Sequence, residues 1–298
     1  MKQNQIDSRK NRILPVERET TLLPFLLESI SGKSRNNIKS ILKHKQVIID
    51  GRPVSQFNFP LTPGQLVEVP VSESGKKVGV LPFPVVYEDG EIIVISKPAG
   101  MLSISTASEK ERTAYHILTE YLRSAGSAER LFIVHRLDRE TSGLILFAKN
   151  EDIKRRLQEN WAELVTHRGY IALVEGRVEK SSGVIRSWLK QTKTLLVYSS
   201  DKPGGGKEAV TRYTLICASD SLSLLSVSLE TGRKNQIRVH MKDIGHPVVG
   251  DGKYGSVTNP ISRLGLHANL LVLNHPVTGK ELRFESPYPP QFKSAVRK

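Results

Sequence analysis

A polar segment between two apolar runs contains the residues best suited to chemistry. The runs LFIV and LILFA flank HRLDRETSG at 135–143, so this polar segment is expected at the edge of a sheet. Asp138 lies between Arg136 and Arg139, and a carboxylate beside cations stays ionised at neutral pH. In a partly dry pocket, such a carboxylate acts as a nucleophile or as an electrostatic stabiliser. A turn held by local salt bridges explains the same pattern, and the residues alone do not separate the two interpretations.

A second polar segment, ETGRKNQIRVH at 230–240, begins a short helix. Asn235 is expected to cap that helix, and its apolar face consists of Ile237, Met241 and Ile244. Arg238 then lies at the border of the buried face, where its guanidinium is suited to clamp a carboxylate with two hydrogen bonds. An ordinary basic helix face is the alternative interpretation.

The elements that must position these segments are mainly strands. From residue 85 onward, several β-prone runs follow one another without helices between them, and only a few helical stripes interrupt them, as at 114–122 and 151–164. Contiguous strands argue against a doubly wound parallel sheet. We therefore expect an α+β fold with a mixed, mostly antiparallel central sheet and surrounding helices, preceded by a small α/β domain.

The small domain is expected to contain a basic helix and a hairpin. Residues 33–45 carry five cations and no acid, and the apolar residues Ile38, Ile41 and Leu42 supply the buried face of a helix. A tight turn at Asp50-Gly51 follows. This arrangement resembles an S4-like RNA-binding domain over 20–70. The resemblance implies RNA contacts by Lys33, Ser34, Arg35, Lys39 and Lys43. A solvated helix face is the alternative.

Composition limits the classes of protein that remain. The chain has 298 residues, a formal net charge of +14 and a single cysteine, so a polyanionic partner is favoured and a disulfide framework is excluded. We expect a cytoplasmic protein with no membrane association, because no apolar run reaches the length of a membrane span. The expected organisation is an N-terminal extension over 1–19, the S4-like domain over 20–70, a linker over 71–84 and a catalytic domain over 85–298.

The two polar segments together resemble the RluA family of RNA pseudouridine synthases. HRLDRETSGLILFAKN and LETGRKNQIRVH carry the resemblance, and KPAG at 97–100, GYIALVEG at 169–176 and GHPVVGDGKYG at 245–255 extend it in family order. A further block, RLGLHANLLVLNHPVTGKELRF, follows at 263–284. The resemblance covers about 85–290, and an S4-like domain often precedes it in that family, in a domain order that looks bacterial.

The resemblance implies isomerisation of uridine to pseudouridine in RNA without a cofactor. Asp138 matches the essential aspartate, which attacks the sugar or assists formation of a glycal. Tyr170 matches the tyrosine that packs against the base and assists proton removal from C5, and Arg238 matches the basic partner of the aspartate. Arg136 matches the arginine that enters the space left by the flipped nucleotide. No metal site is expected, because the histidines have no compact ligand spacing.

The substrate, the assembly, some site residues and two alternative functions remain open at this level. Ribosomal RNA is the expected substrate, with transfer RNA as the alternative, and a monomer is the simplest assembly. Asn235 stands where many relatives have His, and MLSIST follows KPAG where relatives often continue toward His-Pro. A non-catalytic RNA-binding or ribosome-assembly protein is the second hypothesis. A glycosidic hydrolase is the third, with Glu140 as the nearest second carboxylate.

Overall fold

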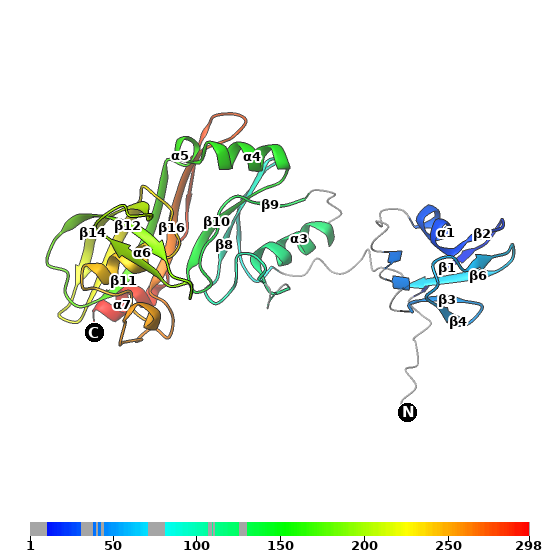
Figure 1. The fold of residues 1–298 in the computed structure, drawn as a ribbon, viewed down its shortest axis with the longest axis horizontal. Coiled ribbons are helices and arrows are strands. Elements are labelled where there is room, and N and C mark those ends of the chain that lie inside the picture. The colour runs from blue at the N-terminus through cyan, green and yellow to red at the C-terminus, as the bar shows by residue number, and fades with distance from the viewer. Residues whose placement is uncertain are drawn as a thin grey trace, which may run out of the picture. The chain divides into compact units, whose positions relative to one another are not determined.

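The computed structural model of the chain divides into two compact units, residues 1–77 and 78–298. The structure describes residues 11–30, 38–39, 41–42, 45–70, 81–106, 109, 111–124 and 130–297. Figure 1 shows the elements of each unit. None of the described helices is long and apolar enough to cross a membrane.

The small unit contains an antiparallel sheet in the order β1-β6-β3-β4, formed by Asn11–Pro15, Leu66–Pro70, Val47–Ile49 and Arg52–Val54. A short pair, β2 (Thr20–Thr21) and β5 (Pro60–Leu61), lies beside helix α1 (Leu22–Ser29). The expected turn at Asp50-Gly51 joins β3 and β4, with positive φ at both residues. Positive φ at both central residues matches the twist of an antiparallel hairpin. Strand β1 comes from the stretch expected to be an N-terminal extension.

The predicted basic helix lies only partly within the described residues. Ile38, Lys39, Ile41 and Leu42 are helical, with Ile38 and Leu42 buried in the small unit's core and Lys39 exposed. The apolar spacing therefore correctly identified the buried face. Lys33, Ser34, Arg35 and Lys43 fall outside the described residues, as do 71–80 of the expected linker.

The large unit contains an eleven-stranded sheet among the described residues. Its main order is β13-β12-β14-β15-β11-β16-β10-β8-β7, with β17 paired to β16 and β9 to β10. The described pairs are antiparallel except β10 with β16, which is parallel. The mixed, mostly antiparallel sheet predicted from the sequence is confirmed. The strands are β7 Val85–Glu88, β8 Ile92–Lys97, β9 Phe132–Ile133, β10 Ser142–Ala148, β11 His167–Glu175, β12 Ser182–Gln191, β13 Val197–Ser200, β14 Lys207–Ala218, β15 Leu222–Leu229, β16 Leu266–Asn274 and β17 Glu281–Glu285.

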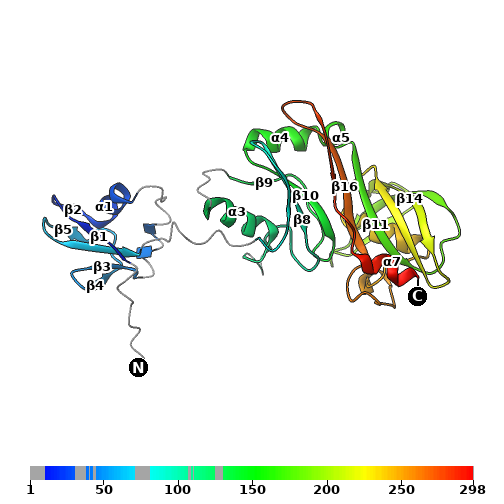
Figure 2. The same cartoon turned by 180° about the vertical axis from the view of Figure 1, so that it is seen from behind.

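Helices cover both faces of β8 and β10, the strands whose sequences are continuous apolar runs. In β8 and β10, alternate residues such as Ile95 and Phe147 pack with α3 (Ala114–Ser124), while their neighbours Val94 and Leu146 pack with α4 (Glu151–Glu159). Because side chains alternate across a strand, α3 and α4 cover opposite faces. Figure 2 shows these two helices beside β8 and β10 from behind. Burial on both faces explains why these strands lack polar alternation.

The same alternation places α6 (Gln236–Asp243) and α7 (Pro290–Val296) against opposite faces of β11 and β15. Val174 and Val227 pack with α6, whereas Leu173 and Leu224 pack with α7. Tyr170 contacts both the α3 core and the α6 core, so α3 and α6 share one face of the sheet. The remaining elements are α5 (Trp161–Leu164) and the short 3-10 helix η2 (Gly252–Tyr254).

Candidate active site

The loop that carries Asp138 is fixed by buried contacts on both sides of that residue. Leu137 is buried, its N–H donates to Ser103 Oγ at 3.1 Å, and its carbonyl accepts from the same hydroxyl at 2.8 Å. The Thr141 N–H donates to the Asp138 carbonyl at 3.2 Å and closes a turn. Asp138 itself is half-buried. A short side chain on a loop held in this way has little freedom to move, which is what a positioned carboxylate needs.

Lys97 holds the Arg139 end of this loop through a buried hydrogen bond. Its side chain is 1% exposed, and Nζ donates to the carbonyls of Pro98, Met101 and Arg139 at 2.9, 2.8 and 3.1 Å. Burial lowers the pKa of Lys97 to about 7, although the charges of Glu140 and Asp138 oppose that shift. The KPAG segment therefore supports the Asp138 loop through the Arg139 carbonyl.

Arg238 links the Asp138 loop to a second carboxylate. Its Nη1 donates to Asp138 Oδ2 at 3.3 Å, while Nε and Nη2 donate to the two oxygens of Asp251 at 2.6 and 2.7 Å. Asp251 is 2% exposed, and the guanidinium carbon lies 5.0 Å from the centre of the Tyr254 ring. Burial works against the charge, but hydrogen bonds and the negative charges of Asp251 and Asp138 raise the pKa of Arg238. This cation is therefore held in one place, aimed at Asp138.

Asn235 lies between Asp138 and Tyr254; it occupies the N-cap position of α6 as expected, but its side chain does not cap the helix. Its backbone is left-handed, with φ 55°, and its side chain makes no capping hydrogen bond to α6. With its amide nitrogen toward the carboxylate, that nitrogen donates to Asp138 Oδ2 at 2.8 Å and the amide oxygen accepts from the Tyr254 hydroxyl at 2.9 Å. The opposite orientation would place two acceptor oxygens face to face. Asn tolerates this backbone conformation better than most residues.

Tyr170 is brought beside the Asp138 loop by strand β16. Tyr170 of β11 pairs with Ala268 on one side of β16, and Gly143, at the start of β10, pairs with Ala268 on the other. The register between β11 and β16 shifts at Gly169 and Tyr170, and such irregularities re-aim side chains. Burial raises the pKa of Tyr170 to about 12, so its phenol is protonated at neutral pH.

These side chains line one cavity of about 220 Å³. Asp138, Tyr170, Arg238 and the exposed Arg136 all contribute to its wall. The structure thus brings together the three predicted catalytic residues and Arg136, the arginine predicted to enter the space left by the flipped nucleotide. Among the residues that line this cavity, Asp138 supplies the only carboxylate. Lys39 belongs to the small unit, which is described separately.

His135 is half-buried, His240 and His267 are buried, and the pKa of each is lowered, which favours the neutral imidazole. The His135 Nε2 accepts the Leu146 N–H at 2.9 Å, and burial lowers the pKa of His135 to about 3, with a smaller contribution from the charge of Arg168. Burial also lowers the pKa values of His240 and His267 to about 4. Among the described residues, no cluster of three or more His, Cys, Asp or Glu is arranged to hold a metal ion.

Sequence reasoning missed Asp251, Tyr254 and Ser103 as parts of the site. The first two lie in the GHPVVGDGKYG block, which carries the family resemblance without indicating roles for its residues. Ser103 lies in MLSIST, the segment that follows KPAG. An isolated Asp after a glycine, followed by Gly and an aromatic residue, was the available signal for the Arg238 partner.

A family model for RNA pseudouridylate synthase matches residues 91–243. The Bacillus subtilis protein YlyB, named an uncharacterized RNA pseudouridine synthase, is 33% identical over 96% of this chain and 95% of its own length. The ribosomal large subunit pseudouridine synthase D of Salmonella typhimurium is 31% identical over 89% of this chain and 86% of its own length. The chain belongs to the RluA family of RNA pseudouridine synthases, and it is therefore an isomerase that acts on RNA.

A solved structure shows the same fold. Human RNA pseudouridylate synthase domain containing 4 superimposes with a TM-score of 0.58, at 24% identity, over 72% of this chain and 91% of that chain.

Proposed function

We propose that the chain converts specific uridines of ribosomal RNA to pseudouridine, with Asp138, Tyr170 and Arg238 as its catalytic residues. The observation that carries the proposal is the single cavity in which the Asp138 carboxylate, the Tyr170 ring and the Arg238 guanidinium meet. The bond from C1′ to N1 breaks, the uracil turns while it is held, and C5 joins C1′. The proton lost from C5 goes to water and N1 gains one, so the reaction is redox neutral.

Asp138 attacks C1′ or assists formation of a glycal, and Arg238 orients its carboxylate through the hydrogen bond at 3.3 Å. A base inside a duplex is out of reach of this cavity, so the target uridine has to leave its stack. Arg136 is exposed at the cavity and takes the space that the uridine vacates. Tyr170 supplies the aromatic face on which the extruded base rests.

Ribosomal RNA is the proposed substrate for two reasons. The Salmonella relative is named for the large ribosomal subunit, and it spans most of this chain. The small unit, with its hairpin and its helical residues Ile38, Lys39, Ile41 and Leu42, supports the proposal of an S4-like RNA-binding role for Lys33, Ser34, Arg35, Lys39 and Lys43. We place the enzyme in the cytoplasm, as a monomer that encounters RNA there.

Release of tritium from RNA labelled at uridine C5 tests the activity directly. Wild type is expected to release tritium from ribosomal RNA faster than from transfer RNA, and Asp138→Asn is expected to release none. Arg139→Gln is the matched control, because Arg139 is exposed on the same loop and does not line the cavity. Absence of tritium release from every cellular RNA pool would contradict the proposal.

The products of the same reaction distinguish an isomerase from a glycosidic hydrolase. A glycosidic hydrolase uses two carboxylates across the bond it cleaves. Glu140, the nearest second carboxylate in the sequence, is exposed and does not line the cavity. We therefore expect pseudouridine in the RNA product and no free uracil. Chromatography of the nucleosides after digestion distinguishes these outcomes.

A further inference from the structure

The Tyr254 hydroxyl lies between a main-chain N–H and the Asn235 amide. It accepts the Val197 N–H at 3.3 Å, and it lies 2.9 Å from the end of the Asn235 side chain. All three residues are buried, so bulk water does not replace either contact. In the described part of the chain, these are the two hydrogen-bonding neighbours of the hydroxyl.

The proton of this hydroxyl determines how the Asn235 amide is oriented. A phenol carries one proton at neutral pH, and a main-chain N–H only donates, so Val197 cannot accept that proton. The Tyr254 proton therefore goes to Asn235, which has to present its amide oxygen. The amide nitrogen then faces Asp138, 2.8 Å from Oδ2 and 3.3 Å from Oδ1.

The opposite orientation of the amide satisfies fewer groups. Its oxygen would accept from Arg238 Nη1 at 3.3 Å, but it would also lie 2.8 Å from Oδ2 of Asp138, which is another acceptor. Among the described residues, the Tyr254 proton would then have no acceptor. One long hydrogen bond does not offset a buried donor without a partner and two oxygens in contact.

Asn235 is thus the closest hydrogen-bond donor to the Asp138 carboxylate among the described residues. Its nitrogen lies 2.8 Å from Oδ2, whereas Arg238 Nη1 lies 3.3 Å from the same oxygen. A hydrogen bond weakens as it lengthens, while the charge of a cation acts over both distances. Arg238 therefore supplies mainly charge to Asp138, and Asn235 supplies mainly direction.

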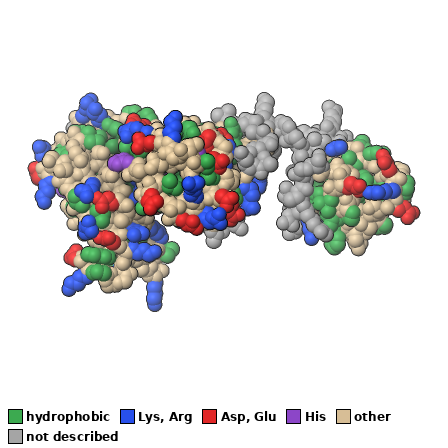
Figure 3. Space-filling view, turned by 90° about the horizontal axis from the view of Figure 1, so that it is seen from above, with side chains coloured by type: hydrophobic (Ala, Val, Ile, Leu, Met, Phe, Trp, Pro, Cys, Tyr) green, Lys and Arg blue, Asp and Glu red, His purple; other side chains and the backbone are tan. Residues whose placement is uncertain are grey.

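Distant surface charges have little influence on the direction of this carboxylate. On the face seen in Figure 3, Lys and Arg are interspersed with Asp and Glu. Salt also screens exposed charges that lie more than about 10 Å apart. The direction of the Asp138 carboxylate is therefore decided by the donors that contact it.

We propose that Tyr254 and Asn235 are positioning residues for the reaction: the Tyr254 hydroxyl sets the orientation of the Asn235 amide, and that amide sets the direction of the Asp138 carboxylate toward the sugar. This inference rests on the proposed function, because it takes the Asp138 carboxylate as the reactive group. The orientation begins at a main-chain N–H of β13, which no side-chain substitution removes.

The test is a double-mutant cycle measured by tritium release from the cellular RNA pool that wild type modifies fastest. Tyr254→Phe keeps the ring and its contact with the Arg238 guanidinium but removes the hydroxyl. We expect kcat to fall by about 10-fold to 100-fold, with KM changed by less than about threefold, because Tyr254 does not line the cavity.

Asn235→Gly supplies the second side of the cycle. It removes the amide and keeps the left-handed backbone, which glycine adopts without strain. In the Asn235→Gly background, Tyr254→Phe is expected to lower kcat by less than about twofold, because the hydroxyl acts through the amide. Equal losses of kcat from Tyr254→Phe in both backgrounds would overturn the proposal, as would wild-type kcat in Tyr254→Phe.

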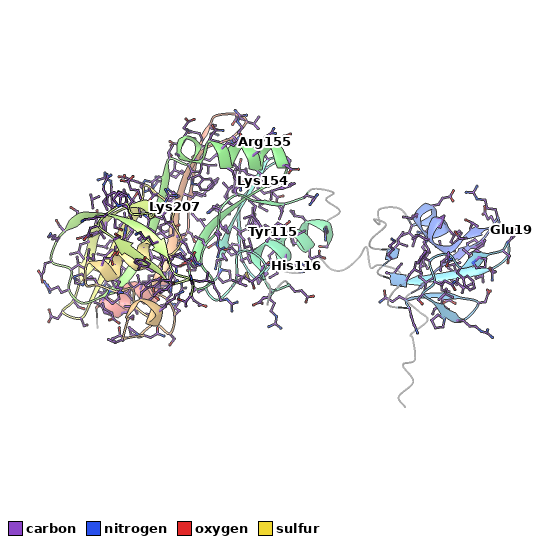
Figure 4. The ribbon with its side chains drawn as sticks, in the orientation of Figure 1. Glu19, Tyr115, His116, Lys154, Arg155 and Lys207 are labelled. Atoms are coloured by element: carbon purple, nitrogen blue, oxygen red, sulfur yellow. The ribbon has the colours of Figure 1, made fainter. Side chains whose placement is uncertain are left out.

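Tyr115→Phe is the matched control. Tyr115 lies on α3 (Figure 4), and its hydroxyl donates to the Leu131 carbonyl at 3.1 Å. It also loses a hydroxyl that is bonded to the main chain, but it does not line the cavity and makes no described hydrogen bond to Asn235. Its kcat is expected to equal that of wild type. A loss in Tyr115→Phe as large as that in Tyr254→Phe would overturn the proposal.

Nuclear magnetic resonance of the RNA-free chain tests the amide orientation with Tyr254 intact. The chain is labelled at the asparagine amide nitrogens, and the Asn235 signals are identified by their loss in Asn235→Gly. One amide proton of Asn235 is expected downfield of the other, because it bonds a carboxylate, and it is expected to move upfield in Asp138→Ala. Amide protons that do not respond to Asp138→Ala would overturn the orientation. Absence of tritium release from every RNA pool, with the downfield proton present, would reject the reaction and leave this hydrogen bond in place.

Discussion

The Arg238 guanidinium reaches Asp138 with one nitrogen, at 3.3 Å, while its other two nitrogens donate to Asp251 at 2.6 and 2.7 Å. The shorter and stronger contacts are thus made away from the cavity, on a carboxylate that is 2% exposed. Asp251 fixes the guanidinium, and the remaining donor faces the reactive carboxylate. The geometry of Asp138 therefore depends on a residue that does not line the cavity.

Asp251→Asn tests this dependence. The amide keeps the size of the side chain but replaces one acceptor with a donor that faces the guanidinium, so Arg238 is expected to shift. Misplacement of a positioning group by about 1 Å costs up to about 100-fold in rate. We expect kcat for tritium release to fall by about 10-fold to 100-fold while KM for RNA changes by less than about threefold. An Asp251→Asn protein with the wild-type melting temperature and wild-type kcat would contradict this role.

Tyr170 variants separate the aromatic face from the hydroxyl. Tyr170→Phe keeps the ring, so its affinity for RNA is expected to remain near wild type while tritium release slows. Tyr170→Ala removes the stacking surface and is expected to weaken RNA binding by about 1–3 kcal/mol. Filter binding in an Asp138→Asn background measures affinity without turnover. Equal affinities of the Phe and Ala variants would show that the ring does not support the base.

Gly143 is required by the close contact between β10 and β16. Its φ is +110°, and a Cβ built there overlaps the backbone carbonyl of Ala268. Gly143→Ala is expected to destabilise the fold by about 3 kcal/mol or more, since both strain and overlap act against it. Gly279→Ala is the control, because Gly279 also has a positive φ but no atom lies within 4 Å of its built Cβ; about 1 kcal/mol is expected there. Urea denaturation measures both, and equal costs would contradict the close-contact explanation.

Protonation of His135 makes the free energy of unfolding depend on pH. Burial, helped by the charge of Arg168, lowers its pKa to about 3 from the ordinary histidine value of 6.5. Between those values the unfolded chain binds a proton that the folded chain does not, so stability rises with pH in this window and is lost as pH falls from about 6.5 toward 3. The slope from this group alone approaches about 1.4 kcal/mol per pH unit.

His135→Gln removes that titration and keeps an acceptor for the Leu146 N–H. The variant is therefore expected to lose less stability than wild type as pH falls from about 6.5 to about 4, as measured by urea denaturation at each pH. His240 and His267 titrate in the same direction in both proteins, so the difference between the two curves isolates His135. Parallel curves would mean that His135 has the same pKa in the folded and unfolded chains, which would contradict this prediction.

The sequence predicted those features that depend on local pattern. Continuous apolar runs such as LILFA became strands covered on both faces, and the spacing of Ile237, Met241 and Ile244 correctly placed α6 against the core. Asn235 shows where local pattern fails. Its residue type favoured a cap, but tertiary contacts with Asp138 and Tyr254 determine its left-handed backbone and the direction of its amide.

Long-range partners were not readable from the sequence. Ser103 and Leu137 exchange two hydrogen bonds across 34 positions, and Gly143 meets Ala268 only because β10 and β16 run parallel. A strand pattern does not specify which distant strand it joins. The reactive segment was therefore found from the sequence, whereas its supports Ser103 and Asp251 required the fold.

Ala268 is the shared neighbour of the two halves of the site, since Gly143 pairs with it on one side and Tyr170 on the other. The distance between the Asp138 loop and Tyr170 is consequently set by the spacing between neighbouring strands, which varies little among sheets. A change in the loops around the cavity is therefore compatible with an unchanged spacing between these two parts of the site. Main-chain hydrogen bonds therefore set how far the Asp138 loop lies from Tyr170, whereas side chains set the direction of the Asp138 carboxylate.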